Sequence, residues 1–141
     1  MESIIEKFCK TLLSLDPKDD ELIGHLYDVA DLLEGISDIS KAFDPIFGFI
    51  ESNPDSDFGS PGPLVHLLED HYPKYVPRLI LSLQNKPTYI AVFMLSRILN
   101  SEHTQVIRDQ YLSLLKSVAS NENADLLAKE QAQDFYDHQT C

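Results

Sequence analysis

The chain has 141 residues, of which 43% are hydrophobic and 24% charged, and its formal net charge at pH 7 is −12. This composition excludes a globally disordered chain, and this length is enough for one domain with one core, so we expect a single domain over residues 1–141. The deficit of Lys and Arg opposes direct binding of nucleic acid, because affinity for phosphate comes from clustered basic side chains.

The net negative charge comes entirely from the first half of the chain. Residues 1–72 contain sixteen Asp and Glu against four Lys and Arg, a net charge of −12, whereas residues 73–141 contain seven of each. An even spread of acids would favour solubility, but a one-sided field steers a cationic partner toward the molecule. This asymmetry is the strongest indication of function that the residues themselves give.

The N-terminus and the apolar runs predict a cytoplasmic protein without membrane contact. Residues 1–6 contain acids where a secretory signal has basic residues, and no cleavage site follows. The longest apolar run, residues 89–95, is far shorter than the roughly 20 residues of a spanning helix. Cys9 and Cys141 form no disulfide framework, so we expect free thiols, with Cys9 either a core residue or a reactive thiol.

Two helices are expected before residue 35. Apolar residues recur at helical spacing over residues 2–15, and Asp16 and Pro17 then predict the start of a second helix that runs to about residue 34.

One face of the second helix is acidic. Glu21, Asp28 and Asp31 share this face, and no Lys or Arg is interleaved with them. Such a stripe is either a solvated surface or a surface that binds a partner.

The third helix is predicted over about residues 38–50, with a kink or restart near Asp44 because Pro45 lies inside the pattern. A long loop follows through residues 51–62 and contains Asp55, Asp57 and Phe58. The two aspartates are candidates for the acidic surface. Phe58 either anchors a partner or docks back onto the core.

Five more helices are expected after this loop. They cover about residues 63–72, 74–84, 89–99, 104–119 and 123–136. The helix at 89–99 is apolar nearly all round and is expected to be the most buried. The last two helices are expected to turn their apolar residues inward, which are Val106, Ile107, Tyr111, Leu114, Leu115, Val118, Ala119, Leu126, Leu127 and Phe135. Eight short helices in antiparallel pairs predict an all-α fold, in the simplest case a short right-handed α-α solenoid.

Residue types used in catalysis are present, but their spacing favours no catalytic residue, metal or cofactor. Ser60 lies between Gly59 and Pro61, outside any Gly-x-Ser-x-Gly elbow. His66 and His71 would point about 140° apart on a helix, which disfavours shared metal ligation.

His66 has three interpretations. It is hydrogen-bonded to Asp70 or to a loop carbonyl, it belongs to a partner-binding face, or it acts with Asp70 in a metal-dependent hydrolase. The hydrolase has the least support in the residues.

Three blocks of sequence resemble a family of small bacterial immunity proteins with HEAT-like helical folds. The blocks are residues 59–66 (Gly-Ser-Pro-Gly-Pro-Leu-Val-His), residues 86–88 (Lys-Pro-Thr) and residues 94–100 (Met-Leu-Ser-Arg-Ile-Leu-Asn). Members of this family are encoded beside polymorphic toxins, including those of contact-dependent growth inhibition systems.

The resemblance implies a cytoplasmic, non-enzymatic inhibitor that binds the C-terminal toxin domain of its own strain's delivery protein in a 1:1 complex. Many such toxins are nucleases, and an RNase A-like ribonuclease is one specific possibility. The expected mechanism is occlusion of a basic active site by an acidic surface.

The alternative is an intracellular helical adaptor that binds a peptide or a housekeeping partner. The expected contact residues are Glu21, Asp28, Asp31, Asp55, Asp57, Phe58, His66, Glu69, Asp70 and Tyr72.

Overall fold

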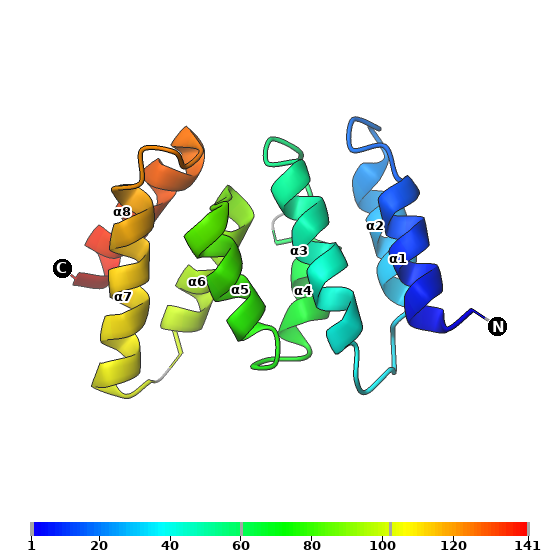
Figure 1. Ribbon diagram of the computed structural model, residues 1–141, viewed down its shortest axis with the longest axis horizontal. Helices are drawn as coiled ribbons and strands as arrows, with labels where there is room; N and C mark the ends of the chain where they lie inside the picture. The colour runs from blue at the N-terminus through cyan, green and yellow to red at the C-terminus, as the bar shows by residue number, and fades with distance from the viewer. Residues whose placement is uncertain (1, 60, 102, 141) are drawn as a thin grey trace. The chain divides into compact units, whose positions relative to one another are not determined.

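The computed structural model describes residues 2–59, 61–101 and 103–140, and within these ranges it has eight α-helices, one 3-10 helix and no strand (Figure 1). The all-α prediction is confirmed. None of the helices in these ranges is long and apolar enough to cross a membrane. The elements are α1 (Ile4–Ser14), α2 (Leu22–Asp31), η1 (Ser40–Ala42), α3 (Phe43–Ser52), α4 (Pro63–Glu69), α5 (Val76–Asn85), α6 (Tyr89–Leu99), α7 (Gln105–Ala119) and α8 (Leu126–Thr140).

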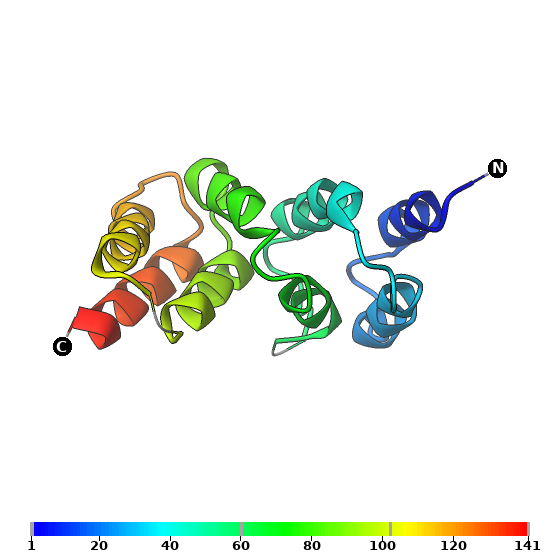
Figure 2. The ribbon, with the colours of Figure 1, turned by 90° about the horizontal axis from the view of Figure 1, so that it is seen from below.

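The chain divides into two compact units, Met1–Arg78 and Leu79–Cys141. In the first unit, α1 packs against α2 and α3, and α2 packs against α4. Figure 2 shows the result as two layers, with α1 and α3 in one and α2 and α4 in the other. In the second unit, α6 packs against both α7 and α8, which also pack on each other. Each unit therefore contains stacked helical hairpins, whereas a single domain over the whole chain stays a prediction.

The first helix begins where Ser3 accepts a hydrogen bond from the N–H of Glu6, at 3.1 Å from donor nitrogen to Oγ. Phe8 and Leu12 are completely buried on its inner face. Cys9 is a free, half-buried thiol, and burial raises its pKa above the ordinary value, which disfavours the reactive thiolate. Cys141 lies outside the described residues.

The second helix begins five residues later than expected. Asp16 accepts a hydrogen bond from the N–H of Lys18, and Asp19 accepts one from the N–H of Glu21, both at 2.9 Å. These local bonds hold residues 16–21 in turns, because short acidic side chains offer the backbone an alternative to helix. The prediction that Asp16 caps α2 is therefore wrong.

The third helix restarts as expected after a short 3-10 turn. Asp38 accepts a hydrogen bond from the N–H of Ser40 at 3.0 Å, η1 follows, and α3 begins at Phe43. Pro45 is thus the third residue of α3. Its missing N–H costs nothing there, since the first N–H groups of a helix have no partner within it.

Two glycines form the turn between the long loop and α4. Gly59 and Gly62 have φ angles of +104° and +92°, in the region that L side chains rarely adopt. A Cβ on Gly62 would lie 1.9 Å from the carbonyl oxygen of Phe58, and a Cβ on Gly59 would lie 2.5 Å from Cα of Gly62. Gly62 then caps α4, with Pro63 as its first residue. Ser60 lies outside the described residues.

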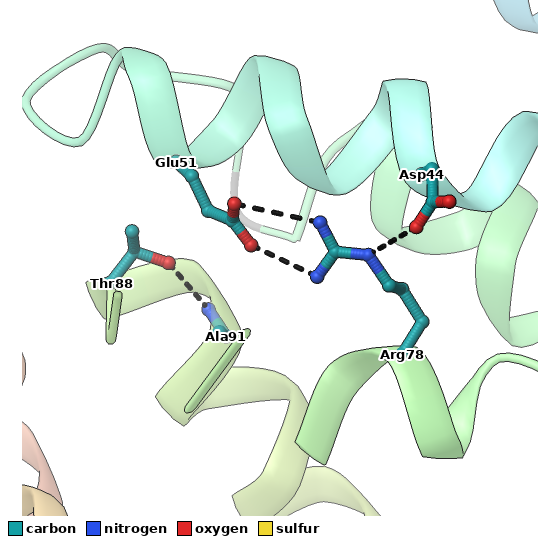
Figure 3. Close-up of polar contacts among 5 residues, drawn as sticks. All are labelled: Asp44, Glu51, Arg78, Thr88 and Ala91. Carbon is teal, nitrogen blue, oxygen red and sulfur yellow. Dashed lines mark hydrogen bonds and ion pairs between the residues drawn. The ribbon is translucent and has the colours of Figure 1, made fainter. Parts of the chain in front are cut away.

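Arg78 joins the start of α5 to α3 (Figure 3). Its Nε donates to Asp44 at 2.6 Å, its Nη1 donates to Glu51 at 3.0 Å, and its guanidinium lies 5.3 Å from the centre of the Phe47 ring. Burial alone would lower the pKa of Arg78, but the hydrogen bonds to Glu51 and Asp44 outweigh it and raise this pKa above the ordinary value. The guanidinium therefore stays charged.

In the second unit, Thr88 caps α6 by accepting a hydrogen bond from the N–H of Ala91 at 3.3 Å (Figure 3). Eight of the eleven residues of α6 are buried, a larger share than in any other helix of the described ranges, so the prediction that it is the most buried helix is confirmed.

The expected inner faces of α7 and α8 are correct only in part: Leu115 and Val118 of α7 are buried, as predicted, but the apolar residues at the start of each helix are not. Val106 and Leu126 are each 67% exposed, and Ile107 and Leu127 are also exposed. The buried side chains of α8 are instead Ala128 and Ala132. Small residues let two helices approach closely, and this contact turns the leucines of α8 outward.

The Gly59–Gly62 turn can be tested by substitution. We expect Gly62→Ala to lower the free energy of unfolding by about 2 kcal/mol or more, because the new Cβ would overlap the Phe58 carbonyl and occupy a strained φ. Urea denaturation measures the change. Gly24→Ala is the matched control, since Gly24 lies inside α2 with nothing within 4 Å of an added Cβ. It should raise stability by about 0.5–1 kcal/mol. Equal effects of the two substitutions would contradict the role of the turn.

Candidate functional site

A groove runs between α2 and α4 in the first unit. It has a volume of about 220 Å³, and its walls come from residues 27–34, in α2 and the turns after it, and from residues 63–70, in α4 and its last cap residue. We call it the α2–α4 groove. It is lined by Tyr27, Ala30, Asp31, Glu34, Pro63, His66, Leu67 and Asp70.

Three of the expected contact residues meet in this groove. Asp31 comes from α2, His66 comes from α4, and Asp70 is the residue at which α4 ends. The structure adds Glu34, so three exposed carboxylates lie on the two walls. Within the described ranges, none of their side chains has a hydrogen-bond or ion-pair partner.

His66 does not take the structural role considered from the sequence. Its side chain is exposed at the groove, and no hydrogen bond joins it to Asp70 or to a loop carbonyl in the described part of the chain. The four-residue spacing does place both residues in one groove. It does not by itself bring their polar atoms into contact.

A second acidic hollow lies between two loops of the same unit. It has a volume of about 440 Å³ and is bordered by residues 17–23 and 55–57. We call it the loop hollow. Ser56 donates a hydrogen bond to the carbonyl oxygen of Pro17 at 3.3 Å, which links the two loops. The hollow is lined by Pro17, Lys18, Asp19, Asp20, Leu22, Ile23, Asp55, Ser56 and Asp57.

The loop hollow contains two expected residues, Asp55 and Asp57, and two that the sequence did not single out, Asp19 and Asp20. Asp57 accepts a hydrogen bond from the N–H of Gly59 at 2.9 Å, so it also supports the glycine turn. Asp19 and Asp20 were overlooked because they were assigned to the first turn of a helix. Recognition of residues 16–21 as successive aspartate-capped turns would have placed them on a loop.

Four other expected residues line neither hollow. Glu21 and Asp28 are exposed, but they border neither the α2–α4 groove nor the loop hollow. Glu69 is half-buried at the end of α4. Tyr72 is exposed beyond that helix, with its ring 6.0 Å from the Tyr75 ring.

The expectation that Phe58 contacts a partner is wrong. It is only 2% exposed, and its ring centre lies 5.7 Å from that of Phe49 on α3. The interpretation that Phe58 docks onto the core is confirmed. Burial of this apolar ring is favourable, and the ring is not offered to a partner as an anchor.

Tyr27 is the aromatic residue at this surface that the sequence interpretation missed. It is 51% exposed and lines the α2–α4 groove. It lies four residues before Asp31, and this spacing puts both on one helical face, so the pattern could have been read from the sequence.

Basic side chains do not neutralise the groove. Lys10 pairs with Glu2, and Arg78 pairs with Asp44 and Glu51. Among the residues described, no Lys or Arg lines the α2–α4 groove, whereas Lys18 lines the loop hollow. Within the same ranges, no three His, Cys, Asp or Glu side chains are placed to hold a metal ion.

Comparison with known proteins finds no relative. No protein family, curated protein or solved structure that was compared with this chain matches it.

Unpaired carboxylates in one groove should cost stability. We expect the double substitution Asp31→Asn and Asp70→Asn to raise the free energy of unfolding slightly, by about 0.5 kcal/mol or less, because it relieves repulsion between like charges. The gain should shrink in high salt, since salt screens exposed charges. Urea denaturation in low and high salt measures it. Asp109→Asn in α7, whose other charged residues are the basic Arg108 and Lys116, is the control and should show no salt-dependent gain. Destabilisation by the double substitution would show that these carboxylates are paired.

Proposed function

We propose that the protein is an immunity protein: an inhibitor that binds a basic toxin domain, most simply a nuclease, and covers its active site. The observation that carries this proposal is the pair of acidic hollows bordered by α2, in a half of the chain with a net charge of −12. The resemblance of residues 59–66, 86–88 and 94–100 to immunity proteins gives the class of partner.

The chemistry of a nuclease suits such a surface. A nuclease binds phosphate, so its active site presents Lys and Arg side chains. Carboxylates on the packed helices α2 and α4 can occupy these positions in place of phosphates. The one-sided field would also speed encounter, with association rates up to about 10⁸–10⁹ M⁻¹s⁻¹ in low salt.

Inhibition of this kind requires no catalysed reaction by this chain. The complex is 1:1, and binding in the cytoplasm keeps the toxin inactive before it meets cellular nucleic acid. An RNase A-like ribonuclease is the specific toxin that we propose to test first.

Binding should depend strongly on salt. We expect the protein to co-purify with the toxin domain encoded in the adjacent gene and to rescue cells that express it. The association rate, measured by stopped flow, should fall by about tenfold or more between low salt and about 0.5 M salt, because salt screens electrostatic steering.

Charge reversal provides the matched control. Asp31→Lys with Asp70→Lys should slow association and abolish rescue, whereas Asp134→Lys in α8 should leave both nearly unchanged. Binding with a flat salt response would contradict steering by the acidic half. Absence of both binding and rescue would contradict an inhibitor of that toxin, and a housekeeping partner that co-purifies instead would indicate the helical adaptor.

A further inference from the structure

The α2–α4 groove contains an aromatic ring as well as carboxylates. Tyr27 is half-exposed there, and in the described part of the chain it makes no hydrogen bond and no ring contact. Asp31 follows it by four residues on the same face of α2, and Glu34, in the turns after α2, lines the same groove. Asp70 lies on the opposite wall.

The same unit shows what an arrangement of this kind binds. On α3, Phe47 lies with Asp44 and Glu51 on one helical face, and the guanidinium of Arg78 lies 5.3 Å from the centre of the Phe47 ring. The same guanidinium is hydrogen-bonded to both carboxylates (Figure 3). The ring-to-carboxylate spacing from Phe47 to Glu51 is four residues, as it is from Tyr27 to Asp31. The α3 site therefore has its own arginine.

The groove has no such arginine from its own chain. The helix that faces α2 has the sequence Pro-Leu-Val-His-Leu-Leu-Glu over Pro63–Glu69 and contains no Lys or Arg. The groove volume of about 220 Å³ is below the roughly 300–1,000 Å³ of small-molecule sites, so its size suits one side chain better than a cofactor.

We propose that the α2–α4 groove binds an arginine side chain of the partner, with the guanidinium over the Tyr27 ring and hydrogen-bonded to Asp31 and Asp70. This inference rests on the proposed function for the source of the arginine, which is the basic site of the toxin. Arginine fits better than lysine, because a planar guanidinium stacks on an aromatic face while it donates to two carboxylates.

A peptide titration tests the groove without the toxin. The probes are the tripeptides acetyl-Gly-Arg-Gly-amide and acetyl-Gly-Lys-Gly-amide, added to the ¹⁵N-labelled full chain and followed by amide chemical shifts. We expect the arginine peptide to shift resonances of residues 27–34 and 63–70 at lower concentrations than the lysine peptide does. Equal responses to both peptides, or shifts confined to residues 17–23 and 55–57, would overturn the proposal.

Substitutions at Tyr27 separate the ring from the charge. Tyr27→Leu should weaken arginine-peptide binding about two- to fivefold, the expected loss of one exposed cation–π contact, whereas Tyr27→Phe should stay within about twofold of the original chain. Asp31→Asn should weaken binding while leaving the ring in place. Because Tyr27 is half-exposed, we expect all three variants to fold, and their amide spectra check this.

The toxin complex gives an independent readout. Tyr27→Leu should raise the dissociation rate and leave the association rate nearly unchanged, since a neutral side chain does not contribute to steering. If the toxin binds and Tyr27→Leu has no effect on dissociation, the inference fails and the proposed function stands. If the arginine peptide binds in the groove but no toxin does, the proposed function is contradicted, whereas the inference that the groove binds an arginine side chain stands.

Discussion

The close approach of Gly59 and Gly62 is the constraint on which the first unit depends. Only glycine fits there, because each φ is positive and a Cβ on Gly62 would overlap the carbonyl of Phe58. Two results follow from this turn. Phe58, directly before it, is buried against Phe49, and α4 begins directly after it, alongside α2. The helix that begins after this turn supplies one wall of the α2–α4 groove, so the glycines contribute to the site through the position of α4 and not through their own chemistry.

Two sites in the first unit combine carboxylates with an aromatic ring, and they differ in whether the chain itself supplies a cation. On α3, the carboxylates of Asp44 and Glu51 flank Phe47 and are satisfied by Arg78. Between α2 and α4, Tyr27 lies beside carboxylates for which the described chain supplies no cation. A satisfied site holds helices together, whereas an unsatisfied site costs stability and remains available to a partner. The difference between the two sites is the physical basis of both proposals.

Much of the fold could be predicted because the apolar spacing is regular. The eight helices, the buried α6 and the restart before Pro45 all follow from periodicity and from the known limits of proline. The start of α2 could not be predicted in this way, since Asp16 and Asp19 cap turns as readily as they cap a helix. Burial was misassigned at the start of α7 and of α8, and in α8 the reason is that periodicity does not reveal which of two faces has the alanines that allow close packing. Within the site, Asp31, His66 and Asp70 were predicted, but the groove between them depends on contacts between helices about 35 residues apart in the chain, which no local pattern encodes.

Partner binding through the α2–α4 groove and the loop hollow is tested most directly by amide hydrogen exchange, measured on the protein alone and in complex with the toxin domain. Amides that a partner covers exchange more slowly, and peptides locate this protection along the chain. We expect protection over residues 17–34 and 55–72, with exchange over residues 105–140 unchanged. Protection confined to α7 and α8, with none on α2 or α4, would contradict the central claim.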